Sequence, residues 1–137
     1  METGIKVGEC MTTHLVTISG TASAKEAAGT MAARDVGSLL VVDSQNRPTA
    51  IVTESDLVRK CLAKGECDAV VAEIATKPLV TITPDADLSE AAKLMGRKNV
   101  KRLVVTDGAG NAQGIISQED IVKLTPSLYD LTARKGQ

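Results

Sequence analysis

Two short segments of this sequence place a hydroxyl three residues before a carboxylate: Thr53-x-x-Asp56 and Ser117-x-x-Asp120. Each follows a short apolar run typical of a strand and precedes a helical pattern, which predicts a strand-to-helix turn. A carboxylate at such a turn can accept two hydrogen bonds from a ribose cis-diol, each contributing about 1.5–3 kcal/mol. The same spacing also caps helices, with Thr or Ser as N-cap and Asp as a favourable first-turn charge. Both interpretations stay open.

Lys101 and Arg102 are adjacent cations at the start of a second apolar strand pattern. A buried charge is costly unless it is paired. A bound phosphate would satisfy both side chains, because Arg offers a planar fork of donors and Lys a point charge. The alternatives are that both side chains extend into solvent at the strand end or pair with nearby Asp and Glu residues.

The composition narrows the class of protein. The chain has 137 residues, with 43% hydrophobic and 24% charged residues and a formal net charge of −1. These values are ordinary for a folded domain, and a near-neutral charge argues against nucleic acid as the main ligand. Tyr129 is the one aromatic residue, so base-stacking platforms are absent. No apolar run is long enough to span a membrane, and the N-terminal segment lacks a signal-peptide core.

The residues that usually support catalysis or metal binding are scarce. Cys10, Cys61 and Cys67 form neither a CxxC motif nor a disulfide-like spacing, which predicts reduced thiols and a cytoplasmic protein. His14 is the one histidine, so a zinc site is not expected. No activated nucleophile and no phosphate-cradling glycine loop is visible, and we expect no enzymatic activity.

The two halves of the chain are copies of each other. A shift of 64 residues aligns 15–18 with 79–82, both Leu-Val-Thr-Ile, and 26–28 with 90–92, both Glu-Ala-Ala. Roughly 19 of 54 aligned positions are identical, which unrelated segments do not reach. Two copies of a mixed unit are too few for an extended solenoid. The predicted domains are a first repeat at 5–64, a second at 69–124 and a tail at 125–137.

Each half predicts the same element order, β-α-β-β-α. Helical spacing of apolar residues, capping residues and β-branched runs place the elements. In the first half they are strands at 15–18, 38–42 and 50–53 and helices at 24–34 and 54–62; in the second half they are strands at 79–82, 102–106 and 114–117 and helices at 88–98 and 118–124. Short helical turns are expected at 7–11 and 71–75.

The central strands constrain the packing. Residues 39–42 and 103–105 are continuously apolar, as expected when both faces of a sheet are covered. Two helices per repeat cover one face, and the sister repeat is the nearest candidate for the other. The prediction is an α+β fold in which two β-α-β-β-α repeats pack sheet to sheet with pseudo-two-fold symmetry.

This ordered pattern, present twice, strongly resembles a tandem pair of CBS domains, often called a Bateman module. It consists of Val-Thr-Ile, a helix, Val-x-x-Leu-x-Val-x-Asp, and an apolar pair followed by Thr/Ser-x-x-Asp. The resemblance covers about residues 5–124. It implies binding of adenosine-containing ligands (AMP, ADP, ATP, S-adenosylmethionine or a dinucleotide) in clefts between paired repeats. It also implies association into disc-like dimers, here a homodimer.

The resemblance further implies two sites, each joining the aspartate of one repeat to strand residues of the other. The first would comprise Ile51, Thr53, Asp56, Thr81, Pro84, Val100, Lys101 and Arg102. The second would comprise Ile115, Ser117, Asp120, Thr17, Val36, Gly37 and Ser38. The first has two phosphate partners and is the better nucleotide candidate. One departure is Ala50, which stands where Gly114 matches the glycine usual in the family and narrows the backbone approach.

The resulting hypothesis is a regulatory module that senses AMP, ADP or ATP without catalysis and requires no cofactor. One alternative is a structural dimerisation module whose sites are degenerate. Another is a module that binds S-adenosylmethionine.

Overall fold

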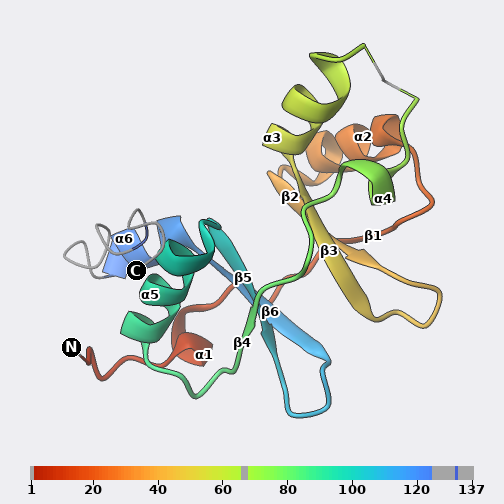
Figure 1. The fold of residues 1–137 in the computed structure, drawn as a ribbon. Coiled ribbons are helices and arrows are strands. Elements are labelled where there is room, and N and C mark those ends of the chain that lie inside the picture. Colours follow the sequence, from red (N-terminus) through yellow and green to blue (C-terminus); the bar gives the residue numbers. More distant parts are fainter. Residues whose placement is uncertain (1, 66–67, 125–131, 133–137) are drawn as a thin grey trace. The chain divides into compact units, whose positions relative to one another are not determined.

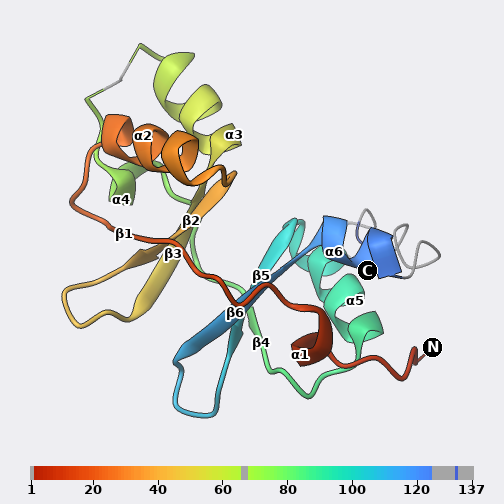
Figure 2. The ribbon, with the colours of Figure 1, turned by 180° about the vertical axis from the view of Figure 1, so that it is seen from behind.

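The computed structural model describes residues 2–65, 68–124 and 132 (Figures 1 and 2). The elements are α1 (Val7–Cys10), β1 (Thr17–Ser19), α2 (Ala24–Arg34), β2 (Ser38–Val42), β3 (Pro48–Thr53), α3 (Glu54–Leu57), the π-helix η1 (Val58–Leu62), α4 (Val71–Ile74), β4 (Thr81–Ile82), α5 (Leu88–Lys98), β5 (Arg102–Thr106), β6 (Ala112–Ser117) and α6 (Gln118–Leu124). The predicted repeated β-α-β-β-α order is therefore confirmed. Cys67 and the predicted tail, apart from Thr132, lie outside the described residues.

The chain forms two compact units. Leu15–Leu79 make the first unit, and the described residues before Leu15 and from Val80 onward make the second. Each unit contains a three-stranded sheet, in the order β1-β2-β3 or β4-β5-β6. The first two strands of each sheet run parallel and the last two antiparallel. The two sheets thus have the same topology, as the internal repeat predicts.

In each unit the helices pack on one face of the sheet (Figure 1). In the first unit, Met31 of α2 and Ile74 of α4 pack in one buried cluster with Leu39, Val41 and Val52 of the sheet. The second unit repeats this core with side chains that are equally buried, which include Val7, Leu88, Met95, Leu103, Ile116 and Ile121. Burial of apolar area, at about 25 cal/mol per Å², holds each sheet against its helices.

Local signals fix the ends of the long helices. Ser23 and Asp87 cap α2 and α5, because their side chains accept hydrogen bonds from the Glu26 and Ser89 main chains. Asp35 and Asn99 end these helices in the left-handed conformation, at φ 53° and 54°. Both helices therefore begin and end at the residues predicted from the sequence.

Each unit includes a four-residue helix from the segment that precedes the first strand of the other unit. The α1 segment lies on the second unit, where the Val7 main-chain N–H donates to the Ala86 carbonyl at 2.9 Å. The α4 segment lies on the first unit, where the Val71 N–H donates to the Ala22 carbonyl at 2.8 Å. The spatial units and the sequence repeats are therefore different divisions of the chain.

The helix predicted at 54–62 differs from a regular α-helix. It is α-helical over Glu54–Leu57 and continues as a π-turn over Val58–Leu62, closed by a bond from the Ala63 N–H to the Val58 carbonyl. Strand β3 starts at Pro48, two residues earlier than predicted. Proline is tolerated there because it is the first residue of an edge strand, where the missing N–H breaks no ladder bond.

Asp87 connects α5 to the N-terminal segment, and we expect this contact to be acid-sensitive. Its carboxylate accepts bonds from the Ser89 N–H at 2.8 Å and the Gly4 N–H at 3.0 Å. The hydrogen bonds from Ser89, and next from Thr3, hold the pKa of Asp87 far below its usual range. A lowered folded-state pKa contributes stability above the unfolded value of about 4, and this contribution is lost as the pH falls below it.

We therefore expect Asp87→Ala to reduce the drop in melting temperature that the wild type shows between neutral and acidic pH. Thermal unfolding at several pH values measures it. Glu90→Ala, which removes an exposed carboxylate from the same helix, is the control and should leave the acid dependence unchanged. Equal acid dependence in Asp87→Ala and the wild type would contradict this role.

Candidate functional site

The Thr53-x-x-Asp56 turn is a capping box at the start of α3. The Thr53 hydroxyl accepts from the Asp56 N–H at 3.1 Å, and Asp56 Oδ2 accepts from the Thr53 N–H at 3.0 Å. The helix-cap interpretation of this motif is therefore correct for the main chain. It leaves Oδ1 of Asp56 for other partners.

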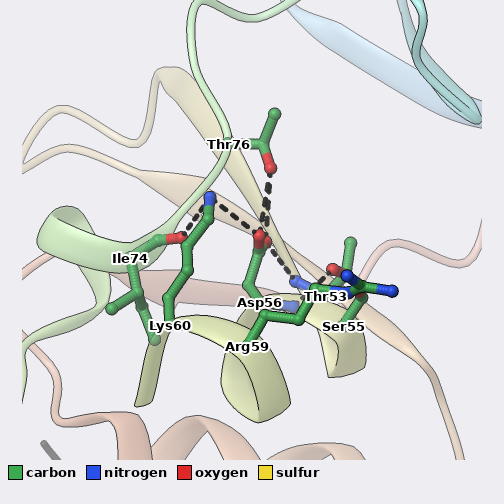
Figure 3. A network of polar contacts seen from close by, with 7 residues as sticks. All are labelled: Thr53, Ser55, Asp56, Arg59, Lys60, Ile74 and Thr76. Atoms are coloured by element: carbon green, nitrogen blue, oxygen red, sulfur yellow. Dashed lines mark hydrogen bonds and ion pairs between the residues drawn. The ribbon is translucent and has the colours of Figure 1, made fainter. Parts of the chain in front are cut away.

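Asp56 has two further partners in its own unit (Figure 3). Lys60 Nζ lies 3.0 Å from Oδ1, and the Thr76 hydroxyl donates to the same carboxylate at 3.2 Å. Lys60 Nζ also donates to the Ile74 carbonyl at 3.1 Å. Asp56 is only 6% exposed, so its charge is compensated by these contacts rather than by water.

The corresponding turn of the second unit is less occupied. Asp120 Oδ2 accepts from the Ser117 N–H at 2.8 Å and from the Ser117 hydroxyl at 3.0 Å. No described residue donates a hydrogen bond to Asp120 Oδ1. Leu124 stands 64 residues after Lys60, so this position of the second unit carries no cation that could bind Asp120 as Lys60 binds Asp56. Asp120 thus retains acceptor capacity for a ligand.

Cys10 of α1 lies within electrostatic reach of Asp120. The pKa of the Cys10 thiol is raised, first by burial and then by the negative charges of Asp120 and Glu9. A raised pKa keeps the thiol protonated at neutral pH, so Cys10 is not an activated nucleophile. Its Sγ lies near the Lys6 and Val7 carbonyls of its own segment.

The strand registers gather predicted site residues on the sheet face opposite the helices. In the first unit, Thr17 pairs with Leu40, Leu40 with Ile51, and Ser38 with Thr53. Cα partners point to the same side of a sheet and neighbouring residues alternate. Because Leu39 and Val52 join the core under the helices, these paired residues face the other side.

The second unit repeats this arrangement with basic residues added. Thr81 pairs with Val104, Val104 with Ile115, and Arg102 with Ser117. Arg102 therefore lies beside the Ser117-x-x-Asp120 turn, and the Lys101 carbonyl accepts from the first N–H of α6, that of Gln118, at 2.9 Å. Neither cation has an ion pair or a side-chain hydrogen bond with any described residue.

The remaining predicted residues flank these faces. Gly37 lies against the start of α3, where an added Cβ would be 2.6 Å from Glu54 Oε1. Val36 and Val100 pack against the two cores, and the Pro84 carbonyl accepts from the Gly8 N–H of the α1 segment. The grouping of Asp56 with Lys101 and Arg102 joins residues of different units and stays a prediction.

The glycine difference noted in the sequence has a structural reason in the second unit. A Cβ on Gly114 would lie 2.8 Å from the Thr12 carbonyl, closer than real Cβ contacts allow. The main chain of Thr12 forms an antiparallel bridge with Ile115, as Thr76 does with Ile51 in the first unit. Gly114 is therefore required by the close approach of the segment after α1.

The sequence did not reveal Lys60 and Thr76 as partners of Asp56. One signal was present, since Thr12 and Thr76 are identical residues 64 positions apart. Lys60 gave no such signal, because an exposed-looking lysine four residues after an aspartate is common on helix surfaces. Among the residues that the structure describes, no three His, Cys, Asp or Glu side chains are grouped to hold a metal ion. None of the helices in this described part has the length and apolar character to cross a membrane.

Two β-α-β-β-α units, each with a Thr/Ser-x-x-Asp turn between its last strand and the following helix, define a tandem α+β pair. The CBS domain family matches residues 7–63 and 71–126, and the chain belongs to that family, with two CBS domains. A protein of Methanopyrus kandleri is 36% identical over 126 residues, which cover 90% of this chain but 64% of the relative. The chain thus spans just under two thirds of that relative.

Two solved structures are similar over nearly their whole length. A CBS domain protein from Pyrobaculum aerophilum, complexed with AMP, has a TM-score of 0.81 and 28% identity, covering 93% of this chain and 98% of that one. A CBS domain pair in complex with 5′-methylthioadenosine and S-adenosyl-L-methionine has a TM-score of 0.81 and 25% identity, with the same coverage. The ligands named for both structures contain adenosine.

Proposed function

We propose that this chain is a regulatory module that binds an adenine nucleotide (AMP, ADP or ATP) without catalysing a reaction. One of the two Thr/Ser-x-x-Asp turns supplies the ribose acceptor, and Lys101 and Arg102 supply phosphate partners. Aliphatic residues of the sheet faces, such as Ile51 and Ile115, contact the adenine. A cytoplasmic setting, as the reduced thiols suggest, belongs to the same proposal.

The observation that carries this proposal is the Asp120 turn. It combines a carboxylate oxygen without a donor among the described residues and a cation, Arg102, paired in register with Ser117. An acceptor for hydroxyls beside a cation that has no ion pair with a described residue matches a sugar phosphate in chemistry. The adenosine ligands of the two similar structures support the same class of ligand.

Calorimetry with AMP, ATP and S-adenosylmethionine tests the proposal. We expect micromolar to submillimolar binding of at least one nucleotide, and its loss in the double variant Asp56→Ala, Asp120→Ala. Retained ligand is also easy to detect, because the chain has no Trp and one Tyr, so released adenine dominates the near-ultraviolet spectrum. No binding at millimolar ligand would reject the proposal. Preferential binding of S-adenosylmethionine would show that this compound, and not a nucleotide, is the ligand.

A structural dimerisation module is the second candidate function, and an exposed apolar groove favours it. A groove of about 400 Å³ in the first unit lies between α2 on one side and α3 with η1 on the other. Its lining includes Met31, Leu57, Val58 and Leu62. Val58 and Leu62 are 56% and 63% exposed, and a second copy of this chain is the occupant that we propose. Light scattering with and without AMP distinguishes the two functions. The mass and size of a purely structural dimer should not change when AMP is added, whereas a sensor should change its association state or shape.

A further inference from the structure

The two aspartate turns are not equivalent, although the sequence repeat makes them look alike. Both begin with the same cap, in which the main-chain N–H of Thr53 or Ser117 donates to Oδ2 of the aspartate three residues later. In the first unit, the other oxygen is held by Lys60 and Thr76. In the second unit, the residue at the position of Lys60 is Leu124, and the Thr12 hydroxyl makes no bond to Asp120 among the described contacts.

The contacts of Asp56 reach across its unit to the connection between the repeats. Thr76 is 20 residues from Asp56 and belongs to the segment that leaves α4 toward β4 (Figure 3). Its main chain is paired with Ile51 of β3, through a bond from the Thr76 N–H to the Ile51 carbonyl at 2.8 Å. Lys60 adds a bond to the Ile74 carbonyl just before it. One carboxylate thus holds the helix, the strand and the connecting segment together.

The π-turn of η1 is the local feature that distinguishes the helix carrying Lys60. The corresponding helix α6 is α-helical throughout its described length, Gln118–Leu124. A π-turn inside a helix is an irregularity that recurs at functional positions because it re-aims side chains. Here it accompanies Lys60, whose ammonium group contacts both Asp56 and the Ile74 carbonyl, while the preceding Arg59 donates a hydrogen bond to Ser55 of the same helix.

We propose that Asp56, Lys60 and Thr76 form a latch that commits the first carboxylate to the connecting segment, so that Asp120 is the carboxylate that receives ligand hydroxyls. This inference rests on the proposed function for its ligand half. A ligand hydroxyl at Asp56 must displace the Lys60 ammonium group and the Thr76 hydroxyl, whereas Asp120 Oδ1 accepts no hydrogen bond from any residue that the structure describes. The asymmetry assigns the stronger binding to the second turn.

The latch itself is tested without ligand. Lys60→Leu, Thr76→Val and Asp56→Asn should each lower the melting temperature by about 3 °C or more, the range for loss of a partly buried polar contact in a chain of this size. In the double variant Lys60→Leu, Asp56→Asn, the decrease in melting temperature should be clearly smaller than the sum of the two single decreases, because both substitutions remove the same ion pair. Arg59→Leu is the matched control and should change little, and Lys60→Arg should restore most of the loss. Additive effects, or no effect of Lys60→Leu, would overturn the latch.

Binding of AMP tests which turn serves the ligand. Asp120→Asn should raise the dissociation constant at least about tenfold with little change in melting temperature, since a charge-assisted bond is lost. Asp56→Asn should lower the melting temperature and keep the dissociation constant for AMP within about twofold. If the two turns differed only in their structural roles, the two variants would not differ in their effect on this constant. The reverse pattern overturns the assignment. If the wild type binds no AMP, ADP or ATP, both the proposed function and the assignment of ligand binding to Asp120 are rejected. The melting temperatures of the single and double variants then still test the latch.

Discussion

Replacing Arg102 by alanine is expected to weaken ATP binding about tenfold or more, because a charge-assisted contact to phosphate contributes about 1.5–3 kcal/mol. Arg102 lies opposite Ser117 at the start of β5 and has no ion-pair partner among the described residues, so its charge is available to a ligand. Adenosine, which lacks phosphate, should lose little affinity. Calorimetry with ATP, AMP and adenosine in parallel measures this difference.

Arg97→Ala is the matched control for this charge. It removes the same guanidinium from the exposed end of α5, five residues before Arg102, and should leave ATP affinity within about twofold once salt screens its distant charge. The affinity of the wild type for ATP should also fall as salt rises. If Arg102→Ala weakens the binding of adenosine as much as the binding of ATP, Arg102 supports the fold of the site instead of binding phosphate.

Leu103→Ala is expected to lower the free energy of unfolding by about 2–5 kcal/mol, the cost of a large-to-small change in a packed core. Leu103 is fully buried in β5 and packs in one cluster with Met95 and Ile116. The loss combines the transfer energy of the removed atoms with the cavity that remains. Urea unfolding measured by far-ultraviolet circular dichroism gives this quantity.

Leu124→Ala makes the same chemical change on the surface. Because Leu124 is 52% exposed, this substitution should lower the free energy of unfolding by well under about 1 kcal/mol. Leu39→Ala, the corresponding core change in the first unit, should match Leu103→Ala, because Leu39 is also fully buried. A loss in Leu103→Ala as small as in Leu124→Ala would contradict the burial of β5.

Most of the secondary structure was predictable because its signals are local. The helices α2 and α5 have the predicted ends, since Ser23 and Asp87 cap one end and residues in the left-handed conformation close the other. Strands β2 and β5 also match, because continuous apolar runs bounded by turns have few alternatives. The strands β1 and β4 are shorter than predicted, because only two or three residues of each pair with the neighbouring strand.

The candidate site was predictable in its residue types and only in part in its contacts. The turns at Asp56 and Asp120 lie where the motif predicted, between a strand and a helix. The cap at each turn follows from spacing alone, because residues three apart meet at a helix start. Thr76 could not be assigned this way, since a contact across 20 residues depends on where the α4 segment packs.

The amino-acid sequence was enough to predict the duplication, the element order, and a hydroxyl and a carboxylate at each strand-to-helix turn. These properties depend on short-range periodicity and capping, which each repeat encodes independently. The folded chain was needed to show that the α1 and α4 segments pack on the unit of the other repeat. It was also needed to show that Lys60 and Thr76 bind Asp56, whereas no described residue donates to Asp120 Oδ1. Those outcomes depend on which distant surfaces bury each other, and burial is a property of the folded chain.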